Sequence, residues 1–215
     1  EINSTDKISP LLVSAYPTTL PLLIGELSSD NVMDNGGQFD TDELIEKLYL
    51  WDSPSISSYD SPYALWEGCY AAIASANMAL EGIENLGSPA SLNPQRGEAL
   101  VCRAYSHFLL ANVFCMPYNP NTAESHLGIP YRTRTGDSVY PENTERGSLK
   151  NTYEQIAADL EAGLPLIKDA AYEVPKYHFN RKAANAFAAR FYLYYQKWDK
   201  VIECCLLYTS PSPRD

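Results

Sequence analysis

Two stretches of the sequence combine aromatic and polar side chains without helical periodicity. One is the Ser/Pro-rich segment 51–59, and the other is the turn-rich segment 28–40. A carbohydrate presents flat apolar C–H faces rimmed by hydroxyl groups, so a site for it needs aromatic rings beside amides or carboxylates. The candidate ligand-binding residues that fit this description are Trp51, Asp52, Tyr59, Asp30, Asn31 and Gln38.

A third stretch, 117–147, is rich in proline and glycine and holds residues of the same kinds. These residues are Tyr118, Tyr131, Arg132, Arg134 and Tyr140. Loop aromatics also pack against a core, and this alternative remains open for Trp51 and Tyr131. A loop this long is usually functional or mobile.

Carboxylates offer a different chemistry. Asp30, Asp34 and Asp52 could supply the acid and base of a glycoside hydrolase. Their spacing does not require it, and the sequence holds no nucleophile motif or phosphate-binding glycine loop. We therefore expect no catalytic residues and no cofactor, and keep a glycan-degrading hydrolase as the alternative.

The five cysteines, Cys69, Cys102, Cys115, Cys204 and Cys205, form no CxxC pair and have no histidine at ligand spacing. This pattern predicts no metal site. The first two lie on successive expected helices and could pair in an oxidising compartment. The odd count and the apolar surroundings favour free thiols.

The bulk composition excludes several classes of protein. The 215 residues are 45% hydrophobic, which suffices for one sizeable core, and the formal net charge of −11 with no basic cluster argues against nucleic-acid binding. No apolar run approaches the roughly 20 residues of a membrane span. The N-terminus also lacks the pattern of a signal peptide, so we expect any export signal to have been removed or never cloned.

Two long helices folded back on each other are predicted over 61–116. Ser61 and Pro62 provide an N-cap and a first helical residue, Gly87 a stop, and Asn93 with Pro94 a second start. The second helix is apolar on every face near its end, which places it in the middle of the fold.

Shorter elements flank this pair. We expect two short helices over 10–27, a loop over 28–40, and a helix capped by Asp40 or Thr41 that runs through Leu50. Three further helices are expected: one from Ser148 that Pro165 ends or kinks, one over 181–196 capped by Asn180, and one beginning at Trp198.

Two of these helices share a pattern: Ala99-x-x-x-Arg103-Ala-Tyr105 and Ala186-x-x-x-Arg190-Phe-Tyr192. Repetition of residue types at fixed offsets, each time on the second helix of a pair, is typical of stacked helix pairs. The sequence thus predicts an all-α fold of tetratricopeptide-like stacked helix pairs with long irregular loops.

A set of ordered motifs resembles the N-terminal half of the RagB/SusD family, over roughly residues 10–203. The motifs are Trp66-x-x-x-Tyr70-x-x-Ile73-x-x-Ala76-Asn77, Arg103-Ala-Tyr105-x-x-Phe108-x-Leu110, Gly128-Ile-Pro130, Arg146-x-Ser148, Tyr153-x-x-Ile156-x-x-Asp159-Leu160, Ala183-Ala184-x-Ala186-x-x-Ala189-Arg190-x-Tyr192-Leu193 and Trp198.

The resemblance implies a non-catalytic outer-membrane lipoprotein of Bacteroidetes that binds a glycan or other nutrient at the cell surface. It also implies a partner, a TonB-dependent SusC-like transporter that receives the ligand. The family's lipid-bearing cysteine is not in this sequence, so membrane attachment through a lipid anchor is an expectation from the family alone.

Two departures from the family bear on the domain boundaries. Family members are much longer, and residues 206–215 abandon the helical pattern. We expect a helical domain over 1–205, truncated at its C-terminus, and a non-native or artefactual tail over 206–215.

Four polar residues on apolar helical faces are expected to be structural: Asn77, Arg103, Asp159 and Arg190. A buried arginine needs a carboxylate or helix-end carbonyls, and Asp159 is the candidate partner. His107 is expected to be a satisfied core residue. A peptide-binding scaffold whose concave groove includes Asn77 is the third functional alternative.

Overall fold

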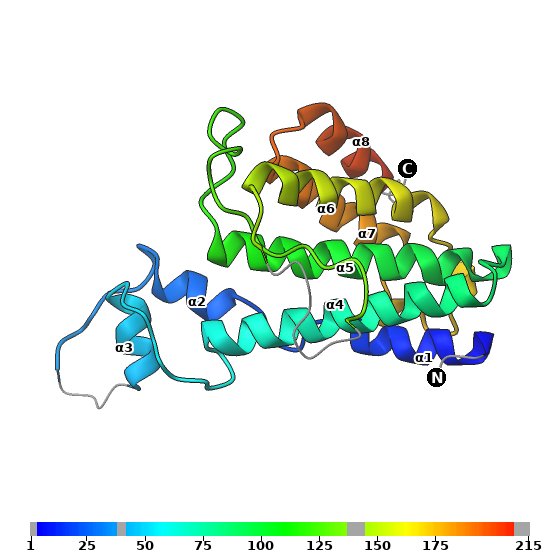
Figure 1. Ribbon diagram of the computed structural model, residues 1–215. Helices are drawn as coiled ribbons and strands as arrows, with labels where there is room; N and C mark the ends of the chain where they lie inside the picture. Colours follow the sequence, from blue (N-terminus) through cyan, green and yellow to red (C-terminus); the bar gives the residue numbers. More distant parts are fainter. Residues whose placement is uncertain (1–3, 38–41, 137–144, 209–215) are drawn as a thin grey trace, which may run out of the picture.

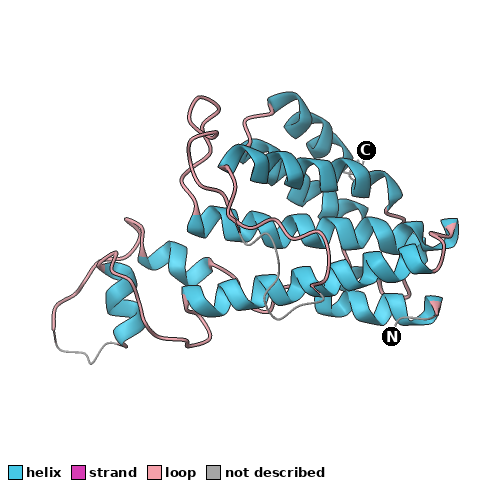
Figure 2. Cartoon of the chain, in the orientation of Figure 1, coloured by secondary structure: helices cyan, strands magenta, loops and turns pink. Residues whose placement is uncertain are grey.

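The computed structural model describes residues 4–37, 42–136 and 145–208. The helices are α1 (Ile8–Leu12), α2 (Leu22–Leu27), α3 (Glu43–Tyr49), α4 (Pro62–Asn85), α5 (Asn93–Phe114), α6 (Leu149–Gly163), α7 (Arg181–Tyr194) and α8 (Trp198–Tyr208). Within these residues there is no strand, and Leu127 and Ser148 form one isolated bridge. The predicted all-α fold is confirmed, as Figure 2 shows.

Helix α5 is the centre of the molecule. Figure 1 shows it between α4 on one side and α6, α7 and α8 on the other, with α2 and α3 at one end. Its middle is almost continuously buried, from Ala99 to Ala104 and from Ser106 to Ala111. A helix apolar all round must be covered on every side, so the predicted central position is confirmed.

Most of the predicted helix boundaries hold because they rest on local chemistry. The Ser61 side chain accepts a hydrogen bond from the Ala64 N–H at 3.1 Å, and the Asn180 side chain accepts one from Ala183 at 2.9 Å. Gly87 follows α4 with φ of +81°, a conformation that glycine adopts without a Cβ penalty. Pro165 lies in the 3₁₀ turn Leu164–Leu166 that ends α6.

Two predicted caps are wrong. The cap of α3 is Asp42, whose carboxylate accepts from the Leu44 N–H at 2.8 Å, whereas Asp40 and Thr41 lie outside the described residues. Asn93 is already the first residue of α5, because the 3₁₀ turn Ala90–Leu92 leads straight into the helix and makes Leu92 its N-cap. The Asn93 side chain therefore does not cap the helix.

The last two helices also differ from expectation. Helix α7 ends at Tyr194, before Gln196, whose φ of +61° breaks the helix. Helix α8 continues to Tyr208, beyond the boundary expected at 205, and residues 209–215 lie outside the described part of the chain.

Two glycines allow a close backbone approach at one point of the contact between α5 and α6. A Cβ on Gly97 would lie 2.7 Å from the Gly163 carbonyl oxygen, and one on Gly163 would lie 2.9 Å from the Gly97 carbonyl oxygen. Only residues without a side chain let the two backbones approach this closely. This contact fixes how α6 lies on the central helix.

Candidate functional site

A hollow of about 390 Å³ lies between the loop after α2 and helix α3. Its lining residues are Leu27, Val32, Met33, Asp34, Asn35, Gly36, Gly37, Ile45, Glu46 and Tyr49. Apolar side chains thus meet amide and carboxylate groups in one depression, which suits a ligand with both apolar and hydroxyl surfaces.

Hydrogen bonds hold the loop against α3. The Ser28 hydroxyl donates to the Leu48 carbonyl at 3.0 Å, and the Asp34 N–H donates to the Tyr49 hydroxyl at 3.4 Å. The Asp34 carboxylate accepts from the Gly36 N–H at 2.8 Å, which closes a tight turn. Two hydrogen bonds thus join the loop to α3, and the third shapes the loop itself.

Trp51 and Asp52 lie at the C-terminal end of α3. The Asp52 N–H donates to the Lys47 carbonyl at 2.8 Å and the Trp51 N–H to the Leu48 carbonyl at 3.3 Å, the pattern of a Schellman cap. Trp51 has φ of +57° and its side chain is 78% exposed. The alternative that Trp51 packs onto the core is therefore wrong.

The other candidate residues are distributed around this end of the molecule. Asp30 and Asn31 are exposed, and the Asn31 amide donates to the Glu26 carboxylate at 3.0 Å. Tyr59 is exposed too, and its hydroxyl donates to the Thr18 carbonyl at 2.6 Å. None of these three residues lines the hollow, and neither do Trp51 and Asp52. Gln38 lies outside the described residues.

None of the ten lining residues was among the candidate ligand-binding residues predicted from the sequence. Tyr49 and Ile45 looked like the apolar side of a helix, and Met33 stood out only as an apolar residue inside a polar loop. Because α3 is short and lies at the edge of the fold, part of its apolar side borders the hollow instead of the core. Met33, which is exposed, was the sequence feature that could have indicated the hollow.

The segment 129–135 crosses the main helices as an extended strap. Tyr70 donates to the Pro130 carbonyl at 2.8 Å, Asn77 to the Arg132 carbonyl at 3.1 Å and Arg103 to the Thr133 carbonyl at 3.2 Å. Side chains of α4 and α5 therefore bind the backbone of the chain itself, where a peptide-binding scaffold would hold a foreign peptide.

Arg103 is buried and its charge is balanced. Its guanidinium donates to both Asp159 carboxylate oxygens, at 2.7 and 2.6 Å, and to the Asn77 side-chain oxygen at 2.9 Å. Burial alone would lower its pKa, but the Asp159 carboxylate raises the pKa above the usual value for arginine. The predicted pairing of Arg103 with Asp159 is therefore confirmed.

His107 completes this buried network. Its Nε2 accepts from the Arg132 N–H at 3.1 Å, so its Nδ1 carries the proton and donates to the Arg103 carbonyl at 2.8 Å. Burial lowers the pKa of His107 to about 3. Its ring stacks on Tyr131 at 3.8 Å, and the Tyr131 hydroxyl donates to Asp159 at 2.7 Å. Tyr131 therefore packs against the core, unlike Trp51.

The prediction that Arg190 is buried like Arg103 is wrong, because Arg190 is exposed. The buried side of α7 consists of Ala184, Phe187, Ala188 and Phe191, and Arg190 points away from it. The shared sequence pattern therefore predicts that both segments are helices, but it does not predict which of their residues are buried.

The remaining expected features concern the cysteines, metals and membranes. All five cysteines are free, and burial raises the pKa of Cys69 to about 12. In the described residues no group of three or more potential ligands could hold a metal ion. The described helices also include none that combines the length and apolar character of a membrane span. Tyr140 lies outside the described residues.

The architecture defines an all-α protein of stacked helical hairpins with a loop-built hollow at one end. A SusD-like family model, described as "Starch-binding associating with outer membrane", matches residues 1–193. The chain belongs to the SusD-like family. No curated protein sequence matches it.

Solved structures show the same fold. A SusD superfamily protein of Bacteroides thetaiotaomicron is 24% identical with a TM-score of 0.75, over 94% of this chain and 45% of that one. One from Bacteroides fragilis is 22% identical with a TM-score of 0.76, over 98% and 50%. Surface glycan-binding protein A of Bacteroides fluxus is 24% identical with a TM-score of 0.65, over 94% and 42%. The chain thus spans half or less of these relatives.

Proposed function

We propose that this chain is part of a cell-surface protein that binds a glycan without turning it over, and that the α2–α3 end makes the contact. The observation that carries the proposal is Trp51, a large indole that is 78% exposed at the end of α3. An exposed ring of this size in a left-handed backbone conformation is unfavourable for folding, which points to a role in binding. Family membership and the solved glycan-binding relative support the same conclusion.

The hydrolase alternative has less support. Its acid and base would be two of Asp30, Asp34 and Asp52, all of which are exposed. The Asp34 and Asp52 carboxylates each accept a hydrogen bond from a nearby backbone N–H, at 2.8 Å in both cases. Such bonds stabilise loop turns and serve no proton transfer.

The peptide-scaffold alternative also has less support. Its groove would include Asn77, which is buried and already bound to Arg103 and to the strap 129–135. A foreign peptide would have to displace a segment of the chain that is held by several buried hydrogen bonds.

The finer part of the proposal concerns the whole protein. We propose that the bound glycan is delivered to a TonB-dependent SusC-like transporter, and that the protein is held at the outer membrane by a lipid anchor. The description of the family as associating with the outer membrane supports this placement. Co-purification of the full-length protein with a transporter barrel would test it, and a protein that purifies alone under mild detergent would contradict it.

The test of glycan binding is titration calorimetry of the wild type and Trp51→Ala with a panel of oligosaccharides. Loss of ring stacking and buried area should weaken binding by about tenfold. Trp198→Ala is the matched control, because Trp198 is also exposed but lies on α8, on the side of α5 opposite α4 and away from α3. Equal affinity of wild type and Trp51→Ala would refute the assignment, and cleaved sugars detected by chromatography would favour the hydrolase.

A further inference from the structure

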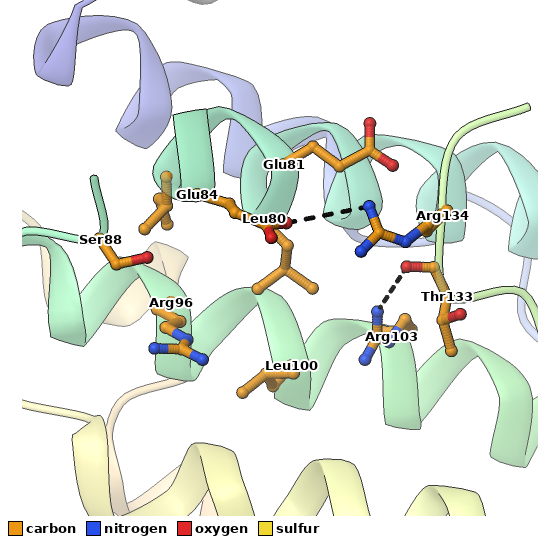
Figure 3. Close-up of a pocket in the computed structure, with 10 residues that line it drawn as sticks. Leu80, Glu81, Glu84, Ser88, Arg96, Leu100, Arg103, Thr133 and Arg134 are labelled. Carbon is orange, nitrogen blue, oxygen red and sulfur yellow. Dashed lines mark hydrogen bonds and ion pairs between the residues drawn. The ribbon is translucent and has the colours of Figure 1, made fainter. Parts of the chain in front are cut away.

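A second cavity, of about 350 Å³, lies between α4 and α5 and far along these helices from α3 (Figure 3). It is lined from three elements. Helix α4 contributes Leu80, Glu81, Ile83 and Glu84; helix α5 contributes Arg96, Leu100 and Arg103; and the loops contribute Ser88, Thr133 and Arg134. Three of the eight arginines in a chain of net charge −11 thus meet at one cavity.

The spacing along α5 gives the cavity its length. Arg96, Leu100 and Arg103 follow one another at i, i+4 and i+7, so they lie on one face of the helix. Seven residues of helix rise by roughly 10 Å. Leucines from both helices lie between the cationic ends, so the cavity has an apolar middle and polar ends.

The charged groups at this cavity are engaged to different degrees. Four of the five N–H donors of Arg103 are used, by the two oxygens of Asp159, the Asn77 side chain and the Thr133 carbonyl. The Glu81 carboxylate accepts from both the N–H and the hydroxyl of Thr135. Both groups are therefore held in the wall by bonds within the chain.

Arg134 and Arg96 are engaged far less. The Arg134 guanidinium lies 3.9 Å from the Glu84 carboxylate, with side chains 72% and 66% exposed, so this ion pair is weak. Arg96 is exposed and makes no hydrogen bond or ion pair within the described part of the chain. Two guanidinium groups at one cavity therefore have donors to spare.

We propose that this cavity is a second binding site, for a small carboxylate of the size of a sugar acid, whose carboxylate pairs with Arg134 at one end and whose hydroxyl groups accept hydrogen bonds from Arg96 at the other. A guanidinium binds a carboxylate through two parallel hydrogen bonds, which neutral hydroxyl groups cannot match. The leucines would contact the apolar face of the ligand's ring. The cavity is at the lower end of the range for small-molecule sites, so it holds one ring and not a chain.

The site is separate from the α2–α3 hollow and does not rest on the proposed function. The proposal predicts a competition inside the cavity, because Glu84 and the ligand carboxylate would both bind Arg134. Neutralising Glu84 should therefore tighten binding, a gain that a merely structural role for these residues would not produce.

The test is titration of the full chain with sodium glucuronate, glucose and acetate, followed by calorimetry or NMR shifts. We expect glucuronate to bind with a Kd on the order of 1 mM and both glucose and acetate to bind more weakly. Arg96→Gln should weaken glucuronate binding by about tenfold, and Glu84→Gln should strengthen it by about twofold to fivefold. Arg190→Gln, which changes an exposed arginine of α7, should leave it unchanged.

Three results would overturn the proposal. One is equal binding of glucose and glucuronate, which would remove the role of the charge. Another is unchanged affinity in a folded Arg96→Gln variant. The third is tighter binding of glucuronate to wild type than to Glu84→Gln, because Glu84 would then assist the ligand instead of competing with it.

Discussion

Trp51 combines two features that are unfavourable in a residue with a purely structural role. Its backbone adopts the left-handed conformation that normally falls to glycine at the end of a helix, and its indole is largely in solvent. Both features lower stability, and no hydrogen bond of the side chain offsets them among the interactions of the described residues. Strain of this kind persists when the residue serves a purpose other than folding.

The strain can be measured by comparing Trp51→Gly with Trp51→Ala. Both variants lack the ring, but only alanine keeps a Cβ at φ of +57°. We expect the glycine variant to have the higher free energy of unfolding, by about 1 kcal/mol, in urea denaturation. Both variants should bind glycan equally weakly. An alanine variant as stable as the glycine variant would show that this position is unstrained.

The sequence predicts chemistry at single residues better than it predicts their exposure. The pairing of Arg103 with Asp159 followed from the cost of a buried charge. The same reasoning failed for Arg190, because the identical pattern lies on a helix that is covered on one side only. Exposure depends on neighbouring elements, which a single residue's sequence context does not contain.

At the scale of elements, one close helix contact depends on a pair of glycines. Gly97 on α5 and Gly163 on α6 let two backbones approach so closely that a methyl group at either position would collide with a carbonyl oxygen. The position of α6 follows from this contact, and with it the position of Asp159, which Arg103 needs.

Gly97→Ala should therefore destabilise the protein. The new Cβ would lie 2.7 Å from the Gly163 carbonyl oxygen and 2.9 Å from the Leu166 Cβ, so the helices must move apart, at an expected loss of about 1–3 kcal/mol in thermal or urea unfolding. The control is Gly25→Ala in α2, where no atom lies within 4 Å of the added Cβ. That change should be neutral or stabilise by up to about 1 kcal/mol. Equal effects of the two substitutions would contradict the close contact.

Elements defined by local chemistry were predictable, whereas elements defined by distant partners were not. Ser61, Asn180 and Gly87 act through bonds or dihedrals within a few residues, and these were placed correctly. The strap 129–135 is extended because side chains of two distant helices bind its carbonyl groups. The sequence of the strap itself does not indicate those partners. The hollow beside α3 could likewise be predicted only in part, from the polar residues of the loop that borders it.

At the scale of the whole molecule, the two ends of the fold differ in character. The end formed by α2 and α3 carries loops and the hollow, while α8 at the other side presents an apolar stripe. Trp198, Ile202 and Leu206 follow one another at i, i+4 and i+8 and are 58%, 60% and 71% exposed. Only Cys204 of this helix is buried. Contiguous apolar surface of this kind marks a surface that associates with another.

This stripe predicts the solution behaviour of the 215-residue chain. We expect the chain to bind an environment-sensitive hydrophobic dye and to self-associate with rising concentration, because association removes the three side chains from water. Ile202→Glu should reduce both the dye fluorescence and the apparent mass in sedimentation. Leu22→Glu is the matched control, since Leu22 on α2 is exposed to a similar degree but belongs to no such stripe. A wild-type chain that stays monomeric, binds no dye and unfolds cooperatively would contradict the prediction that the stripe causes self-association.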